Sequence, residues 1–208
     1  MASAASDSLP KIQLDFLYHL TCDLNDAYEL GTGPFGSRSL VTFGREQHDI
    51  YPLSKDRFEQ SMDSAGRFEG PRLKGKIMEG NGADWRIHQD YTDDQGNECA
   101  AAYLDTRCTL VLSVSQRCAT MIDHCSEDAL LTDDGAVILV QTSGVRCGKK
   151  SVLNNLDNPN VTARDYSMRV TIKLESGDPR YQWLNRLVAV GVAERKGNSI
   201  AYNAYALN

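Results

Sequence analysis

Hydrophobic and polar side chains alternate most regularly near the start of the chain. From Ile12 to Leu24 nearly every second residue is apolar, and the residues between them are mostly polar. The apolar members are Ile12, Leu14, Phe16, Tyr18, Leu20, Cys22 and Leu24. A period of two predicts a β-strand with one buried face. Asn25-Asp26 favours a turn and is expected to end this strand.

Two further long segments alternate in the same way, Ala102–Leu112 and Tyr166–Leu174. Shorter predicted strands are Leu40–Phe43, Arg72–Met78, Trp85–Gln89, Val137–Thr142, Leu187–Glu194 and Ser199–Leu207. Turn signals separate many of them, at Gly31–Gly36, Asp94–Asn97, Asp133–Gly135 and Lys196–Asn198. The chain is therefore expected to run mainly through β-hairpins.

Helical patterns are weak, and only Lys55–Ala65 and Cys118–Leu131 favour short helices. Without crossover helices the strands are expected to pair antiparallel. A meander of this many strands closes on itself or splits into two packed sheets. We expect one all-β domain over residues 11–208, an antiparallel closed β-barrel with one or two short helices, after a disordered tail over residues 1–10. A barrel of about eight strands can hold one small ligand, as lipocalins do.

Composition and charge limit the partners and the cellular location that we expect for this protein. The 208 residues carry a formal net charge of −6 and no basic stripe, which argues against a nucleic-acid partner. No signal peptide and no apolar run of membrane-spanning length stand out, so we expect a cytoplasmic protein without a membrane partner. The six cysteines form no CxxC pair and are expected to be buried free thiols.

Two segments match cofactor-binding motifs in part, but the residues around them do not suit a cofactor site. Gly31–Gly36 matches GxGxxG, but a predicted strand follows it where a dinucleotide site needs a helix, and Pro34 removes an amide donor. Gly144–Ser151 departs from the spacing of a phosphate-binding loop and is expected to be a basic loop. The four histidines are scattered. We expect no metal and no cofactor.

Candidate chemistry centres on Asp105 and Arg107, which share a strand face with Tyr103. Ionised groups in the middle of a strand must pair or face water. This face is therefore either the solvated outside or a wet interior in which these groups bind and polarise a substrate. Further candidate substrate-binding residues are Asp84, Trp85, Gln141, Arg169, Trp183 and Asn185. For Trp183 and Asn185, structural anchoring of a barrel end stays equally open.

Five ordered blocks resemble the family of microbial proteins known as domain of unknown function 3237. They are Phe68–Gly75, Gly82–Trp85, Leu104–Arg107, Asp134–Ile138 and Pro179–Asn185. The resemblance implies a calycin-like β-barrel that often associates with itself, and it brings no established activity. Fungal members commonly lie near natural-product biosynthesis genes, which implies a role with metabolites. Extra sequence at Gly44–Arg67 and Ser113–Leu131 is expected to form a lid at the rim or an oligomer interface.

The favoured hypothesis is a cofactor-independent isomerase, cyclase or dehydrating lyase of secondary metabolite biosynthesis, acting on a polyketide-like or terpenoid-like compound. Asp105 would be the general acid or base, Arg107 would stabilise negative charge, and Tyr103, Trp85 and Trp183 would shape the pocket. The alternative is a lipocalin-like carrier of a small hydrophobic metabolite. A third hypothesis is a structural protein with a filled barrel. A homo-oligomer is expected in each case.

Overall fold

The computed structural model describes residues 10–44, 64–78, 82–107, 128–132 and 134–208. Within these ranges the chain forms one antiparallel sheet of eleven strands. The strands are β1 (Leu14–Gly33), β2 (Gly36–Phe43), β3 (Ser64–Glu69), β4 (Lys74–Met78), β5 (Ala83–Thr92), β6 (Glu98–Arg107), β7 (Asp128–Thr132), β8 (Val137–Lys149), β9 (Ser167–Glu175), β10 (Ala189–Lys196) and β11 (Ser199–Leu207). The helical elements are α2 (Lys150–Leu153) and the 3-10 helix η1 (Gln182–Arg186).

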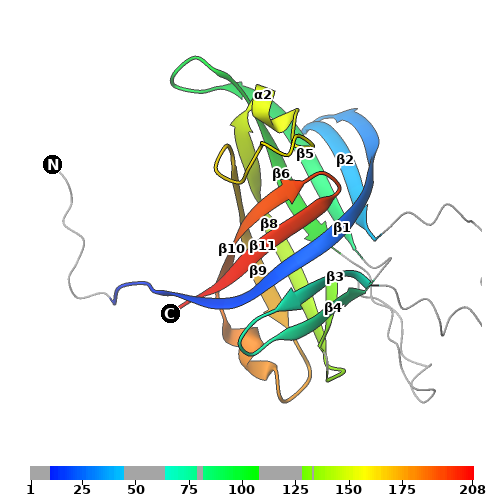
Figure 1. Cartoon of the computed structure of the whole chain (residues 1–208), viewed down its shortest axis with the longest axis vertical. Helices are drawn as coiled ribbons and strands as arrows, with labels where there is room; N and C mark the ends of the chain where they lie inside the picture. The colour runs from blue at the N-terminus through cyan, green and yellow to red at the C-terminus, as the bar shows by residue number, and fades with distance from the viewer. Residues whose placement is uncertain (1–9, 45–63, 79–81, 108–127, 133) are drawn as a thin grey trace, which may run out of the picture.

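The first and last strands close the sheet into a ring. Residues Leu14–Asp23 of β1 pair with β11, while Leu24–Gly33 pair with β2. From β11 the ring passes through β10, β9, β8, β6, β5 and β2 and returns to β1 (Figure 1). The expected all-β, antiparallel and barrel-like fold is therefore confirmed. We call the interior of this ring the lumen.

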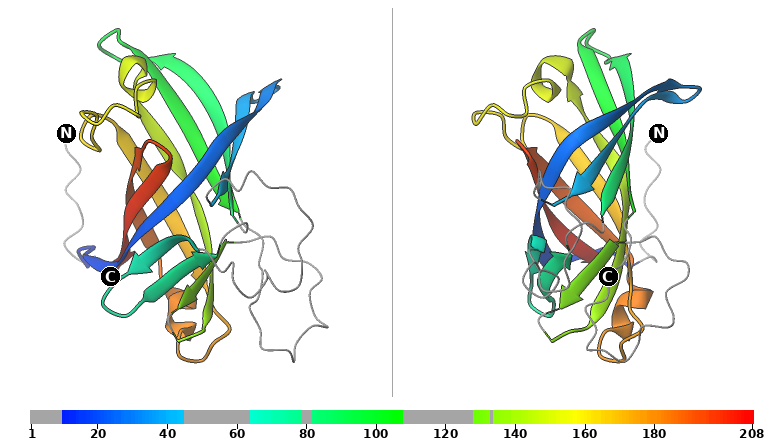
Figure 2. Two further views of the ribbon diagram at one scale, coloured as in Figure 1. Left: turned by 45° about the vertical axis from the view of Figure 1, so that its right-hand side comes forward. Right: turned by 90° about the vertical axis from the view of Figure 1, so that its right-hand side faces the viewer.

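One side of the ring is built in two halves. Between β1 and β8, the strands β2, β5 and β6 form one half, and β3, β4 and β7 form the other (Figure 2). Strand β1 changes partner after Cys22, which pairs with Gly66 of β3, and before Leu24, which pairs with Phe43 of β2. Strand β8 changes from β7 at Val140 to β6 at Thr142. We call the line where the two halves meet the seam.

Apolar side chains fill much of the lumen. Strand β9 alternates regularly, with Met168, Val170, Ile172 and Leu174 buried and the residues between them more exposed. Tyr18 of β1 is fully buried, and its ring makes edge contacts with Phe68 and Tyr202. The hydroxyl groups of Tyr18 and Tyr202 lie 3.1 Å apart, so each phenol has a polar partner inside the core.

Within the described residues the strand predictions hold with three corrections, and residues 108–112 of the predicted strand Ala102–Leu112 lie outside them. Strand β1 continues through Asn25-Asp26 to Gly33, because a register shift between Leu24 and Ala27 accommodates the turn-favouring residues as a bulge. Gly144–Ser151 is not a loop, since β8 runs through Lys149 and α2 follows directly. Strands β3 and β7 were not predicted, because their short segments lack clear alternation.

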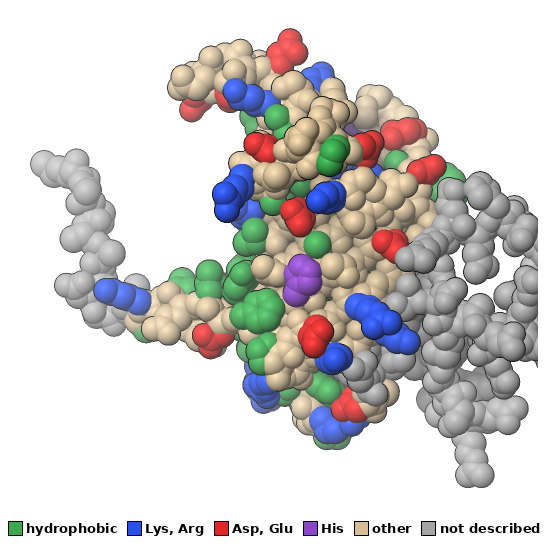
Figure 3. All heavy atoms as spheres, in the orientation of Figure 1, with side chains coloured by type: hydrophobic (Ala, Val, Ile, Leu, Met, Phe, Trp, Pro, Cys, Tyr) green, Lys and Arg blue, Asp and Glu red, His purple; other side chains and the backbone are tan. Residues whose placement is uncertain are grey.

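Most of the two predicted helices lies outside the described residues. The described ends of those segments are strand, since β3 begins at Ser64 and β7 covers Asp128–Thr132. In the described ranges, no helix is long and apolar enough to cross a bilayer. On the face shown in Figure 3, acidic and basic side chains are interspersed without a patch of one sign.

Candidate functional site

Strand β5 directs a row of polar side chains into the lumen. Asp84 and Arg86 are each only 4% exposed, while Trp85 between them is 44% exposed. This difference follows from the two-residue period of a strand, which sends alternate side chains to opposite faces. His88 continues the inward row. The inner face of β5 therefore carries charge into a largely apolar interior.

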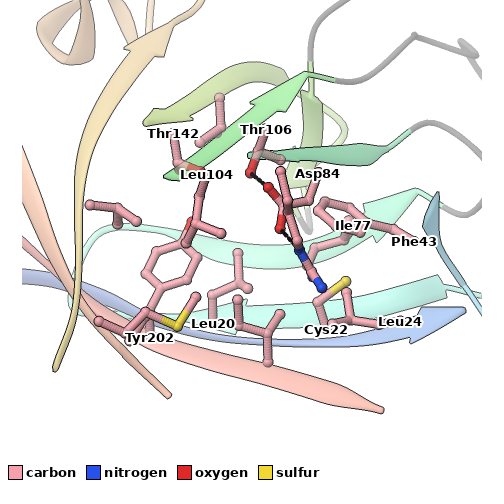
Figure 4. A pocket seen from close by; sticks show the side chains of 16 residues that line it. Leu20, Cys22, Leu24, Phe43, Ile77, Asp84, Leu104, Thr106, Thr142 and Tyr202 are labelled. Carbon is pink, nitrogen blue, oxygen red and sulfur yellow. Dashed lines mark hydrogen bonds and ion pairs between the residues drawn. The ribbon is translucent and has the colours of Figure 1, made fainter. Parts of the chain in front are cut away.

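Asp84 and Arg86 form a buried ion pair. The Nε of Arg86 donates to Oδ2 of Asp84 over 2.6 Å. The hydroxyl of Thr106, on the neighbouring strand β6, donates to Oδ1 of Asp84 over a longer 3.5 Å (Figure 4). Both ions are removed from water, so each depends on the other for charge compensation.

A partly enclosed cavity of about 50 Å³ lies beside this pair. Its wall includes Asp84, Arg86, Thr106 and Thr142 among mainly apolar side chains. The apolar lining residues are Leu20, Cys22, Leu24, Phe43, Ile77, Leu104, Val140, Met168, Val170, Ala193, Ile200 and Tyr202. Several of these stand at the seam, where β2 and β4 end and β5 begins. A cavity of this size holds only a few water molecules, so a metabolite would insert its end rather than its whole body.

The side chain of Arg146 on β8 points into the lumen, level with His88, the next inward residue after Arg86 on β5. It pairs across the sheet with Ala102, which in turn pairs with His88. The side chain is 8% exposed, and its Nε has no hydrogen-bond partner among the described residues. Burial, followed by the charges of Arg86 and Arg195, lowers the pKa of Arg146 to about 10. Arg146 is thus a buried cation at neutral pH.

Arg195 and His88 complete the polar part of the lumen. The Nε of Arg195 donates to the Gly197 carbonyl over 3.0 Å, and burial together with the charge of Arg86 lowers the pKa of Arg195. His88 Nε2 lies 2.8 Å from the Ser39 hydroxyl. Burial, then the charges of Arg146 and Arg86, lowers the pKa of His88, so this imidazole is neutral at pH 7.

Of the residues predicted for the site, Asp84 is the one that the structure places in the cavity wall. Asp105 alternates with the buried Leu104 and Thr106 and pairs with Trp85, so it lies on the outer face of the ring. Tyr103 shares this outer face and is 48% exposed. The backbone of Arg107 pairs with Ala83, but its side chain lies outside the described structure. The catalytic role of Asp105 and Arg107 stays a prediction. That role required side chains that point into the lumen, and Asp105 points outward.

The remaining predicted residues do not line the cavity. Gln141 alternates with the buried Val140 and Thr142, and Arg169 is exposed on β9. Trp183 packs under Arg72, whose guanidinium carbon lies 3.7 Å from the ring centroid. Asn185 accepts a bond from the Ser176 amide and donates to the Ser176 carbonyl, over 2.8 and 3.0 Å. For Trp183 and Asn185 these contacts favour the anchoring alternative.

Sequence reasoning did not select Arg86, Arg146, Arg195 and Thr106. The signal that identifies them is their position along a strand. Arg146, Arg195 and Thr106 occupy inward positions of strands whose other inward residues are apolar or small, and Arg86 stands two residues after Asp84 on the inward face of β5. Arg146 was not considered as a lumen residue, because its segment Gly144–Ser151 was predicted to be a basic loop. Alternate residues of a strand point to opposite faces, but the sequence identifies the inward residues only when it is known which face is buried.

The comparisons with known proteins agree with this fold. Residues 127–207 match the family model described as "Protein of unknown function (DUF3237)". The UPF0311 protein of Rhodopseudomonas palustris strain CGA009 is 33% identical over 78 residues, which are 37% of this chain and 51% of that protein. A protein of strain TIE-1 is 32% identical over the same length. The chain thus spans about half the length of the curated relatives that it matches.

Solved structures extend the similarity over nearly the whole chain. A β-barrel-like protein from Acinetobacter baumannii is 32% identical, with 98% of this chain and 100% of that chain covered and a TM-score of 0.62. The R. palustris protein of unknown function is 21% identical, with 96% and 100% covered and a TM-score of 0.66. An enzyme from Penicillium herquei is 16% identical, with 97% and 98% covered and a TM-score of 0.51, which shows a shared fold alone. Family model, relatives and barrel-like fold agree, and the chain belongs to the DUF3237 family of proteins of unknown function.

Proposed function

We propose that this protein is a small-molecule enzyme that transfers protons in its lumen, with Asp84 as the group that takes up and returns the proton. The observation that carries this proposal is the buried Asp84 carboxylate on the wall of an apolar cavity, held by Arg86 at 2.6 Å. A carboxylate fixed in a mostly dry site is a general base that needs little reorganisation.

The chemistry follows from the order of groups along β5. Asp84 removes a proton from a carbon next to a carbonyl group, and the electron pair of that C–H bond moves toward the carbonyl oxygen. Arg86 uses its Nε for Asp84, and no hydrogen bond from its terminal amino groups to a described residue is found. These groups can stabilise the developing enolate oxygen. Return of the proton to another carbon gives an isomer, and loss of a β-hydroxyl as water gives an unsaturated product.

The cavity wall favours an apolar metabolite of polyketide-like or terpenoid-like character. Its lining is mainly aliphatic, and its volume of about 50 Å³ admits only the reacting end of such a molecule. The similar fold of the P. herquei enzyme supports catalysis on this architecture. It does not supply the reaction.

The test is an incubation of the protein with a small-molecule extract of its producing organism in D₂O, followed by mass spectrometry. Proton transfer predicts that specific compounds gain deuterium or are converted, at a rate that falls at least about 100-fold in Asp84→Asn. Asp105→Asn, on the outer face, is the matched control and is expected to keep the wild-type rate. Thr106→Val, which removes only the hydroxyl beside the carboxylate, provides a milder lumen variant. If wild-type and heat-denatured protein give the same deuterium pattern, the proposal fails.

A carrier function is the second candidate. It is favoured by the closed Asp84–Arg86 pair, which already satisfies both charges within an apolar cavity. A carrier would retain a compound from the same extract without deuterium uptake or chemical change. Recovery of an unchanged compound by native mass spectrometry would therefore favour this function over catalysis.

A further inference from the structure

Arg146 is a buried cation whose surroundings provide little compensation. It is 8% exposed, and the described residues form no ion pair with it and give its Nε no acceptor. Across the sheet it pairs with Ala102 on one side and with Met168 on the other. Neither neighbour offers an oxygen atom from its side chain.

Two of its electrostatic neighbours are cations. Arg86 and Arg195 each disfavour the charge of Arg146, while Asp84 and Tyr166 favour it. Asp84 is itself paired with Arg86. Arg195 is compensated in part by Asp157, which is exposed. Among the buried groups, three guanidinium groups face the single carboxylate of Asp84, so positive charge is in excess in this part of the lumen. His88, the next group in the row, is neutral at pH 7 and does not offset them.

Such an arrangement is expensive for the free protein. A charge taken out of water without a partner destabilises the fold, and natural proteins rarely keep one without a function. The planar guanidinium fork matches the oxygen atoms of carboxylate and phosphate groups, which can accept two parallel hydrogen bonds. An anion would satisfy the unused donors of Arg146 and compensate the excess charge together.

We propose that Arg146, together with Arg86 and Arg195, binds the anionic group of an apolar small molecule in the lumen. Arg86 connects the two parts of this site, because it lines the apolar cavity and interacts electrostatically with Arg146. The apolar part of the ligand lies against the cavity wall. This inference rests on the proposed function for the location of the site and names the class of its substrate, but it does not require turnover.

The test measures binding of three matched probes by titration calorimetry at low salt. Benzoate and phenyl phosphate carry the two anionic groups that fit, and benzamide is the neutral analogue of benzoate. We expect the wild type to bind at least one anion ten-fold or more tightly than benzamide. The preferred anion distinguishes a carboxylate ligand from a phosphate ligand.

Two variants assign the binding to the lumen. Arg146→Met is expected to weaken anion binding at least ten-fold. Arg169→Met removes an exposed arginine from the outer face of the neighbouring strand and is expected to change it less than two-fold. Equal affinity for benzamide, absence of binding of both anions at millimolar concentration, or full binding by Arg146→Met would overturn the inference.

Thermal unfolding separates a binding role from a structural one. If Arg146 is kept for a ligand, Arg146→Met raises the melting temperature of the free protein and abolishes the further rise caused by the bound anion. If Arg146 instead supports the fold, Arg146→Met lowers the melting temperature, and the inference is overturned. Anion binding without deuterium transfer would leave this inference standing and contradict the proposed catalysis alone.

Discussion

The Nε of Arg86 lies 2.6 Å from Oδ2 of Asp84, two residues earlier on the same strand, and both side chains are almost fully buried in the lumen. Each ion therefore depends on its neighbour, since neither reaches bulk water. This mutual dependence has a direct consequence for stability.

Asp84→Asn is expected to lower the free energy of unfolding by roughly 3–5 kcal/mol, because it leaves the Arg86 cation buried without its partner. Urea denaturation measures this change. The double variant Asp84→Asn with Arg86→Met, which removes both charges, is expected to regain most of the loss. A double variant less stable than Asp84→Asn alone would show that the pair does not compensate in this way.

Stability is expected to fall as the pH decreases below about 6.5. The pKa of His88 is lowered in the folded protein, by burial first and then by the charges of Arg146 and Arg86. Between the folded pKa and the ordinary value of 6.5, the unfolded chain binds more protons, so acidification favours unfolding. The contribution of the neutral His88 to stability is fully present well above pH 6.5 and decreases as the pH falls through this window.

His88→Gln tests the assignment of this pH dependence. The variant keeps a polar group near Ser39 but cannot take up a proton. Thermal unfolding followed from pH 7.5 to pH 5.5 should show a smaller decrease than in the wild type. An unchanged decrease would assign the effect to other groups.

Gly144→Ala is expected to destabilise the protein by about 3 kcal/mol. A Cβ atom at this position would lie 2.1 Å from the Arg169 carbonyl oxygen and 2.7 Å from the Val170 Cα, so backbone atoms of β9 would have to move. Gly177→Ala is the control, because no atom of the residues that the structure describes lies within 4 Å of its Cβ position. Chemical denaturation of both variants checks the close approach of β8 and β9, and equal stabilities would contradict it.

Trp183→Leu is expected to reduce stability and to leave ligand binding unchanged. The ring stacks on Arg72 and does not line the cavity, and loss of a cation–π contact costs about 0.5–2 kcal/mol in addition to lost packing. Thermal unfolding and the benzoate titration measure the two effects separately. Loss of benzoate binding without loss of stability would show that Trp183 contacts the ligand and would contradict the anchoring role.

The sequence predicted the architecture better than the site. Alternation located the strand around Met168 and Ile172 and ended the chain in a strand beginning at Ser199, because the hydrophobic period is a local property. It failed at Asn25-Asp26, where pairing on both sides of the bulge outweighs the local preference for a turn.

The orientation of charged residues could not be derived in the same way. Asp105 and Thr106 are both polar, and only closure of the ring shows that Thr106 faces inward and Asp105 outward. Arg146 sits in a glycine-rich and basic segment that resembles a loop, yet pairing with β6 and β9 holds it in a strand. Long-range pairing thus determines which residues form the site.

The most direct test of the central claim compares deuterium transfer from D₂O by the wild type, Asp84→Asn and Asp105→Asn in the same metabolite extract. A reactive lumen predicts that Asp84→Asn loses the activity while Asp105→Asn retains it, with both variants folded by circular dichroism. Loss of activity in Asp105→Asn with full activity in Asp84→Asn would place the chemistry on the outer face and contradict the account.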